Sequence, residues 1–141
     1  MFSSGEIAEV TGGRLIGADT AVSGVSTDTR TIEKGMLFVA VRGESFDGND
    51  FIEAAAEKGA AAVVSDREDG AESHSVPVIL VKDSRKAQLA LARYHRMKFP
   101  LKLVGVTGSV GKTSTKDMVY AVLSAKYNTL KTEGNFNNDI G

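Results

Sequence analysis

The residue types best suited to chemistry lie at positions 103–114, where the sequence reads LVGVTGSVGKTS. An apolar stretch leads there into a turn that contains Gly108 and Gly111, and Lys112 and Thr113 follow directly. Glycines let backbone N–H groups close around phosphate oxygens, a lysine can place its charge on the terminal phosphates, and a threonine hydroxyl can bind Mg²⁺. The pattern therefore predicts a P-loop that binds the phosphates of ATP together with Mg²⁺.

This loop departs from the general P-loop pattern G-x-x-x-x-G-K-[ST] at its first position. Val106 stands where the first glycine belongs, and Gly105 comes one position too early. What remains is G-x-x-G-K-T between an apolar stretch and a helical pattern, an order that chance rarely produces. Within it, Lys112 is the predicted catalytic residue and Thr113 the predicted metal ligand. The residues predicted to bind the nucleotide are Thr107, Gly108, Ser109, Val110, Gly111, Lys112, Thr113 and Ser114.

Two polar stretches upstream have residue types that could contact a ligand. The first is STDTR at 26–30, and the second is GESFDGN at 43–49, whose length and polarity suit the sugar or base of a nucleotide. Clusters of this kind are more often Asx or ST turns that close a strand. The residue types alone leave both alternatives open.

The composition is that of an ordinary globular chain, with 141 residues of which 42% are hydrophobic and 25% are charged. The net charge of −1 gives no overall field that would attract nucleic acid or an anionic membrane. The lack of cysteine excludes disulfide scaffolds, thiolate zinc sites and thiol nucleophiles, and the two histidines have no metal-ligand pattern around them. Because no apolar stretch has the length of a signal peptide or membrane span, we expect a cytoplasmic protein.

Apolar stretches alternate with helical patterns along the chain, which predicts an α/β fold with a largely parallel sheet. The expected helices begin at Ser3, at Asn49 or Asp50, after Asp83 and at Lys112. They are expected to cover 3–10, 49–58, 84–97 and 112–125. The expected strands cover 14–16, 36–41, 61–64, 78–81, 101–106 and 128–132.

Taken together, the motifs resemble those of the Mur ligases, the ATP-dependent amide-forming enzymes of peptidoglycan precursor synthesis. The turn TGSVGKT at 107–113 is similar to the T-G-x-x-G-K-T loop of this family, which usually lacks the same first glycine. Upstream, the stretch at 26–30, GMLFVA at 35–40 and GESFDG at 43–48 resemble the N-terminal domain that holds the uridine nucleotide of the substrate. The resemblance covers nearly the whole chain, with the motifs in the right order.

The ending TEGNFNNDIG at 132–141 resembles the member of the family that adds D-alanyl-D-alanine to UDP-N-acetylmuramoyl-tripeptide. This resemblance implies that ATP phosphorylates the carboxylate of the tripeptide and that the amine of the dipeptide attacks the resulting acyl phosphate. It also implies a role in cell wall biogenesis, and with it in cell shape and division. The residues that it implies for substrate binding are Ser26, Thr27, Asp28, Thr29, Arg30, Gly43, Asp47, Asn135, Asn137 and Asn138.

The resemblance divides the chain into a small α/β domain for the uridine nucleotide at 1–82 and the beginning of a P-loop ATP-binding domain with a parallel sheet at 83–141. Few residues follow Lys112, whereas a P-loop domain needs several more strands. We therefore expect the N-terminal part of a longer ligase, which is inactive without the C-terminal part of the same polypeptide.

Three alternatives to this assignment remain open at the level of the sequence. They are another Mur ligase, which forms the tripeptide, a P-loop metabolite kinase and a nucleotide-binding module. About a hundred residues precede the loop, enough for a separate substrate domain, which favours a ligase over a kinase.

Overall fold

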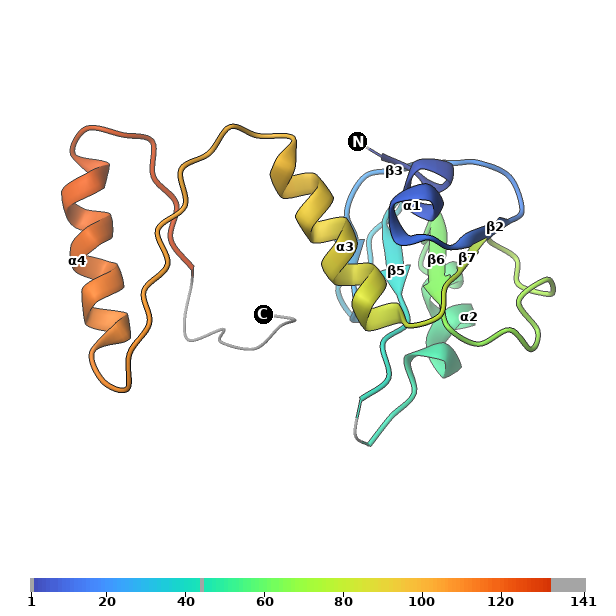
Figure 1. Ribbon diagram of the computed structural model, residues 1–141. Coiled ribbons are helices and arrows are strands. Elements are labelled where there is room, and N and C mark those ends of the chain that lie inside the picture. The colour runs from blue at the N-terminus through green and yellow to red at the C-terminus, as the bar shows by residue number, and fades with distance from the viewer. Residues whose placement is uncertain (1, 44, 133–141) are drawn as a thin grey trace. The chain divides into compact units, whose positions relative to one another are not determined.

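The computed structural model describes residues 2–43 and 45–132 and forms two compact units, Met1–Lys98 (unit 1) and Phe99–Gly141 (unit 2). Figure 1 follows the chain from unit 1 to unit 2. The division falls later than the boundary expected after residue 82. The reason is that α3 (Ser84–Met97) packs against α1 (Ser4–Thr11) and so belongs to unit 1.

A five-stranded sheet forms the centre of unit 1, with the strand order β2-β7-β6-β5-β4. Strands β4 to β7 run parallel, and β2 pairs antiparallel with β7 at one edge. The α/β class with a parallel-rich sheet is thereby confirmed. The strands of this sheet are Arg14–Ile16 (β2), Val25–Ser26 (β4), Leu37–Val39 (β5), Ala62–Ser65 (β6) and Val78–Leu80 (β7). A separate pairing joins Phe2–Ser3 (β1) and Ala21–Val22 (β3).

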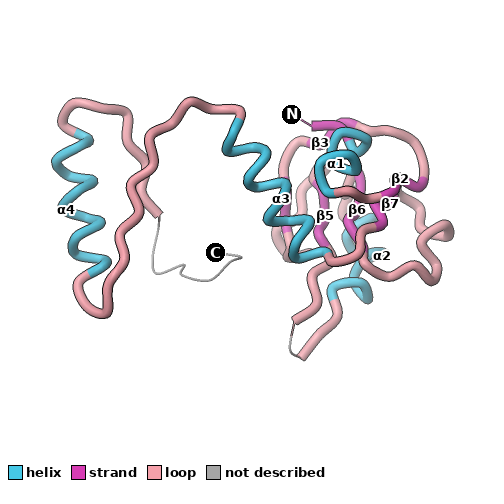
Figure 2. The backbone as a smooth tube through the Cα atoms, viewed as in Figure 1, coloured by secondary structure: helices cyan, strands magenta, loops and turns pink. Residues whose placement is uncertain are grey.

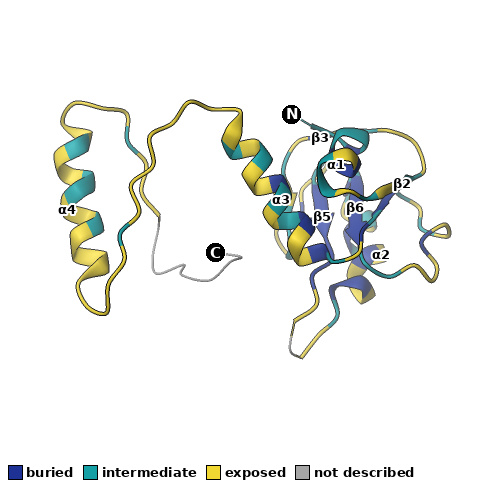
Figure 3. Ribbon diagram, viewed as in Figure 1, coloured by how far each residue is buried: buried dark blue, intermediate teal, exposed yellow. Residues whose placement is uncertain are grey.

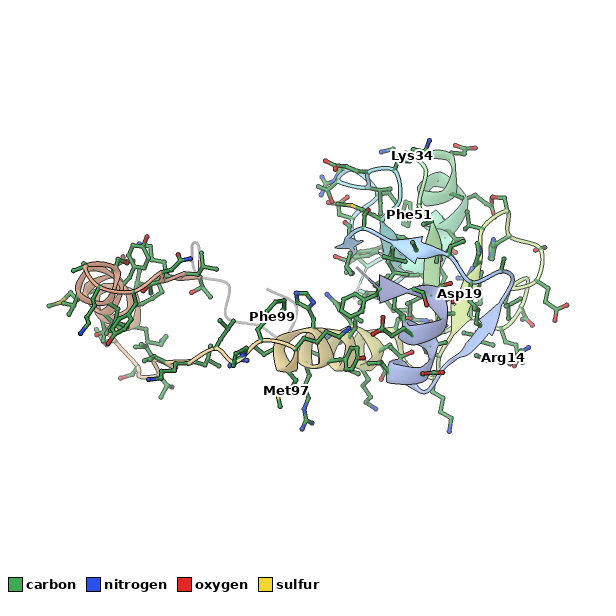
Figure 4. The ribbon with its side chains drawn as sticks, turned by 90° about the horizontal axis from the view of Figure 1, so that it is seen from above. Arg14, Asp19, Lys34, Phe51, Met97 and Phe99 are labelled. Carbon is green, nitrogen blue, oxygen red and sulfur yellow. The ribbon has the colours of Figure 1, made fainter. Side chains whose placement is uncertain are left out.

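Local signals set the ends of α1 and α3. The Ser3 hydroxyl accepts a hydrogen bond from the amide of Glu6 at 3.2 Å, and Gly12 ends α1 in the left-handed conformation at φ 66°. The Asp83 carboxylate accepts one from the amide of Lys86 at 3.0 Å, so the predicted cap and bounds of α3 are confirmed. Asp19 supports α1 from outside the helix by accepting the amide hydrogen of Gly5, and Figure 4 shows it beside this helix.

The second helical segment begins with a short 3₁₀ turn, η1 (Gly48–Phe51), which continues as α2 (Ile52–Glu57). Asp47 caps this turn, because its carboxylate accepts the amide hydrogen of Asn49 at 2.9 Å. The prediction that Asn49 or Asp50 caps the segment is therefore wrong.

Within the described residues, no helix is long and apolar enough to cross a membrane.

Side chains of the central strands alternate between two apolar clusters, as the pleat of a strand requires. Leu37 and Val39 of β5 belong to the cluster that contains Leu91 of α3 and residues of α1. Phe38, between them, belongs to the cluster that contains Ile52 of α2. Helices α1 and α3 therefore cover one face of the sheet and α2 covers the other (Figure 1). Figure 3 shows the strands between them as the most buried part of unit 1.

In unit 2 the described residues contain one helix, α4 (Lys112–Ser124), and otherwise loops (Figure 2). The predicted helix is confirmed, but the strands expected at 101–106 and 128–132 are wrong. A strand needs a neighbour that takes up its backbone hydrogen bonds, and the described part of unit 2 contains no such pairing. No residue of α4 is buried, and its Met118 and Val122 are exposed (Figure 3).

Candidate functional site

A pocket of about 480 Å³ lies in unit 1, where the chain leaves two neighbouring parallel strands. One wall comes from the residues after β4 and another from the segment after β5. The carboxyl ends of parallel strands are where open α/β sheets bind ligands. The lining residues are Thr27, Asp28, Thr29, Arg30, Phe38, Phe46, Gly48 and Phe51. Four of the residues predicted to bind the substrate are thus brought together in one pocket.

The loop after β4 is held in shape by its own hydrogen bonds. The Ser26 hydroxyl accepts the amide hydrogen of Asp28 at 3.0 Å and lies 2.8 Å from the Thr31 hydroxyl. From the other side, Lys58 Nζ donates to the Thr29 carbonyl oxygen at 2.8 Å. Ser26 does not line the pocket; it organises the loop that does. The stretch at 26–30 therefore forms the expected turn and also lines the pocket, so the two alternatives given for it do not exclude each other.

Asp28 and Arg30 form a closely matched ion pair on the pocket wall. Arg30 Nη2 lies 2.6 Å from Asp28 Oδ2, and its Nε lies 3.0 Å from both carboxylate oxygens. The amide of Arg30 also donates to Asp28 Oδ1 at 2.8 Å. These hydrogen bonds lower the pKa of Asp28 to about 2, with the side chain of Arg30 as the largest cause. The wall therefore carries both a fixed negative charge and a fixed positive charge at neutral pH.

The second wall carries aromatic side chains that are not buried. Phe46 is 58% exposed and Phe51 43% exposed, and Figure 4 labels Phe51 in the segment that leads into α2. Exposed aromatic rings in a pocket suit stacking against a nucleobase. The stretch at 43–49 was predicted as a candidate ligand loop, but Phe46, Phe51 and Phe38 were not predicted individually. A phenylalanine inside an otherwise polar stretch is the signal that could have identified Phe46.

Gly43 and Asp47, which were also predicted to bind substrate, support this wall from outside the lining. A Cβ atom on Gly43 would lie 2.6 Å from the Phe46 ring, so only glycine leaves room for that ring. Asp47 Oδ2 accepts a hydrogen bond from Arg67 Nη2 at 2.8 Å, and Asp47 Oδ1 accepts one from Asn49 Nδ2 at 2.7 Å. Burial tends to raise the pKa of Asp47, but the hydrogen bonds from Asn49 and Arg67 outweigh it and lower this pKa.

Unit 2 places the glycine-rich turn directly before α4. Gly111 has φ 79°, which favours glycine, and no side chain caps the helix that follows it. Lys112 turns back over the loop, with its Nζ 2.6 Å from the Gly108 carbonyl oxygen. A helix start without a side-chain cap from its N-cap residue, with a lysine beside it and no acidic residue in the first turn, fits the phosphates of a nucleotide. The residues at 107–114 predicted to bind ATP therefore lie together at this end of α4.

The predicted metal ligand Thr113 belongs to the first turn of α4, next to Lys112. Residues 2–43 and 45–132 contain no group of three or more histidine or carboxylate side chains that could hold a metal ion. Thr113 thus stays a prediction as an Mg²⁺ ligand. The predicted substrate residues Asn135, Asn137 and Asn138 lie outside the described residues.

Two family descriptions match this chain: "Mur ligase family, catalytic domain" covers residues 21–98, and "Mur ligase middle domain" covers residues 106–141. The UDP-N-acetylmuramoyl-tripeptide–D-alanyl-D-alanine ligase of Bacillus subtilis is 46% identical over 138 residues, which are 96% of this chain and 30% of that protein. The UDP-N-acetylmuramoyl-L-alanyl-D-glutamate–2,6-diaminopimelate ligase of Chlorobaculum tepidum is 45% identical over 123 residues, 86% of this chain and 24% of that protein.

Solved structures give the same result. The crystal structure of MurF from Acinetobacter baumannii has a TM-score of 0.87 and 32% identity, with 99% of this chain and 31% of that chain covered. MurF from Thermotoga maritima in complex with ADP has a TM-score of 0.73 and 38% identity, over 80% of this chain and 26% of that chain. The chain therefore spans about 30% of the length of the first relatives that it matches.

Proposed function

This chain belongs to the Mur ligase family, and we propose that it is the N-terminal part of an ATP-dependent ligase that joins D-alanyl-D-alanine to UDP-N-acetylmuramoyl-tripeptide. The observation that carries the proposal is the similarity to the tripeptide–D-alanyl-D-alanine ligase of Bacillus subtilis, which extends over 96% of the chain. That similarity includes both the pocket of unit 1 and the loop at the start of α4.

In this proposal unit 1 binds the uridine nucleotide of the substrate. Phe46 and Phe51 supply apolar ring faces for the base, and the hydroxyls of Thr27 and Thr29 supply hydrogen-bonding groups on the facing wall. Arg30, although paired with Asp28, keeps further N–H donors that can meet an anionic oxygen. A pocket with stacking surfaces on one side and polar groups on the other suits a nucleotide.

Unit 2 binds ATP in the same proposal. ATP supplies the phosphoryl group that activates the peptide: a carboxylate oxygen attacks the γ-phosphorus and ADP leaves. The amine nitrogen of D-alanyl-D-alanine then attacks the acyl carbon and loses a proton, and phosphate leaves as the amide bond forms. The role of this chain is to hold the phosphates, through the backbone N–H groups of the loop, and to place the Lys112 ammonium where negative charge develops. Mg²⁺ would bind to the Thr113 hydroxyl.

A second candidate has support from one comparison. The diaminopimelate ligase of Chlorobaculum tepidum is 45% identical to this chain, nearly as similar as the tripeptide–D-alanyl-D-alanine ligases. A ligase that forms the tripeptide would use the same type of nucleotide pocket and the same type of loop. The two candidates differ in the amino substrate and in the length of the peptide on the nucleotide.

The two candidates are separated by the release of ADP from the full-length protein. We expect turnover with UDP-N-acetylmuramoyl-tripeptide and D-alanyl-D-alanine, and none with UDP-N-acetylmuramoyl-L-alanyl-D-glutamate and 2,6-diaminopimelate. The reverse result would establish the second candidate. The 141-residue chain alone should release no ADP above the blank with either pair, and any such release would contradict the expectation that it is inactive without further residues.

A further inference from the structure

Asn49 lies in η1, behind the aromatic wall of the pocket, and is only 4% exposed. Its Nδ2 donates to Asp47 Oδ1 at 2.7 Å and to Asp66 Oδ1 at 2.9 Å. Its Oδ1 accepts a hydrogen bond from the Ser65 hydroxyl at 2.7 Å. Both donor hydrogens and the acceptor of this amide are therefore used, and its partners come from its own turn and from the end of β6.

The two carboxylates on either side of Asn49 are each bound by an arginine. Arg67 Nη2 lies 2.8 Å from Asp47 Oδ2, and Arg42 Nε lies 3.0 Å from Asp66 Oδ1. Arg42 Nε also lies 3.7 Å from Asp47 Oδ2, so Arg42 lies within salt-bridge distance of both carboxylates that the Asn49 amide joins. A side chain between two carboxylates must donate to both, which an amide does and a carboxylate cannot. The charges around Asn49 therefore favour a side chain with N–H donors at this position over an acidic one.

This network fixes the position of the segment at 45–51, which carries Phe46, Gly48 and Phe51 of the pocket. On one side the segment lies directly against the chain after β5, because a Cβ on Gly48 would be 2.6 Å from the backbone nitrogen of Val41. On the other side Asn49 ties it to Ser65 and Asp66. Within η1, which carries Phe51 of the aromatic wall, Asn49 is the residue with a buried side chain.

We propose that Asn49 is a positioning residue for nucleotide binding: it holds the segment at 45–51 against the end of β6, so that Phe46 and Phe51 present their rings to the base. The inference rests on the proposed function, since it takes the uridine nucleotide as the ligand of this pocket. Asn49 touches no ligand in this account and acts through the two phenylalanines. Its loss weakens nucleotide binding more than it weakens the fold of unit 1, whose two apolar clusters lie outside the network.

The test is calorimetric titration of the 141-residue chain with UDP. Asn49→Asp places a third carboxylate between Asp47 and Asp66, so we expect UDP to bind at least about tenfold more weakly. Adding Asp66→Asn removes one negative charge and returns a donor, and we expect it to restore part of the affinity. The control is Asp50→Asn, which changes the other carboxylate bound by Arg67 and should leave the affinity within about twofold.

Urea unfolding of each variant separates positioning from a general loss of stability: positioning predicts that the affinity falls in Asn49→Asp, and partly returns with Asp66→Asn, while each chain remains folded under the conditions of the titration. Unchanged UDP affinity in a cooperatively folded Asn49→Asp chain would overturn the inference and leave the proposed function standing. If Asn49→Asp does not fold, Ser65→Ala decides: without adding charge it removes the hydrogen bond to Asn49 Oδ1, together with the one that Ser65 Oγ accepts from the Arg67 amide, so unchanged affinity there overturns the inference. A wild-type chain that binds no UDP would remove the proposed function and this inference with it.

Discussion

At the residue scale, the charged groups that matter most are Lys112 at the proposed ATP site and the Asp28–Arg30 pair at the proposed uridine-nucleotide site. Lys112 is the first residue of α4, and its ammonium lies 2.6 Å from the Gly108 carbonyl oxygen, over the loop expected to surround the phosphates. Asp28 and Arg30 lie on the wall of the other proposed site. For each site, one substitution that removes a single charge gives a testable prediction.

Replacing Lys112 with alanine removes the positive charge from the loop but no buried contact, because α4 has no buried residue. In the full-length ligase, Lys112→Ala should lower kcat by about 100-fold or more, as expected when a charge-stabilising group is lost from a phosphoryl-transfer site. The cooperative unfolding transition should be preserved. Steady-state ADP release measures the effect, with Lys126→Ala as the control for loss of an exposed lysine beyond the helix. A rate equal to wild type would mean that the P-loop assignment is wrong.

Asp28 should titrate far below an ordinary aspartate. Its pKa is lowered from 3.8 to about 2 by Arg30, so the ion pair stabilises the loop fully above about pH 4, and this stabilisation is lost as the pH falls toward 2. Carbon-detected NMR titration of the Asp28 carboxyl should show the low value in the wild type and a higher pKa in Arg30→Ala, which loses the side-chain hydrogen bonds but keeps the amide of residue 30 as a donor. An unshifted pKa in the wild type would show that the pair does not form in solution.

Residues whose role depends on a local pattern could be predicted from the sequence. Residues whose role depends on contacts between distant segments of the chain were missed. The turn at 107–113 could be recognised because its glycines, lysine and threonine are consecutive. Phe51 could not be recognised, because nothing local shows that it meets the loop after β4 in one pocket, and for Phe46 the only local signal is an apolar ring in a polar stretch. Asn49 was expected as a helix cap and as part of the polar stretch at 43–49; its role between two carboxylates depends on Asp66, which is far away in sequence.

At the scale of elements, α3 decides where unit 1 ends. Its Leu91 is buried in the cluster that also contains residues of α1, β5 and β6, so the helix is part of the core of unit 1. The boundary expected from the resemblance lay before this helix, after residue 82. Its packing against α1 and the sheet, which the sequence does not show, makes the helix part of unit 1.

Leu91→Ala should therefore lower the free energy of unfolding of unit 1 by about 2–5 kcal/mol, because it leaves a cavity against the sheet. Leu89→Ala is a matched control on the same helix: Leu89 is 41% exposed whereas Leu91 is 4% exposed, so its effect should stay below about 1 kcal/mol. Urea unfolding followed by circular dichroism measures both values. Equal, small effects would contradict the assignment of α3 to the core of unit 1.

The elements also show which predictions local signals can support. The helix at 84–97 was predicted correctly because Asp83 and its apolar face are local features, and α4 was predicted correctly within one residue of its end. The strands at 101–106 and 128–132 were wrong because an apolar stretch becomes a strand only where another strand pairs with it. Described residues of unit 2 offer no such partner.

The two units of the chain have different proposed tasks. Unit 1 has a complete sheet covered on both faces and a pocket at the carboxyl ends of its strands, whereas the described part of unit 2 has one exposed helix behind a glycine-rich turn. Family membership favours a ligase over the metabolite kinase or generic nucleotide-binding module that the loop alone would allow. Binding of the uridine nucleotide is accordingly assigned to unit 1, and this assignment is the central claim.

Calorimetric titration of the 141-residue chain with UDP-N-acetylmuramoyl-tripeptide, UDP and ATP in parallel tests this claim most directly. Because unit 1 has a buried core on both faces of its sheet and holds the pocket, both uridine nucleotides should bind with one site per chain. ATP should bind weakly or not at all, because the loop of unit 2 lacks packed strands behind it in the described residues. Binding of ATP without binding of either uridine nucleotide would contradict the account.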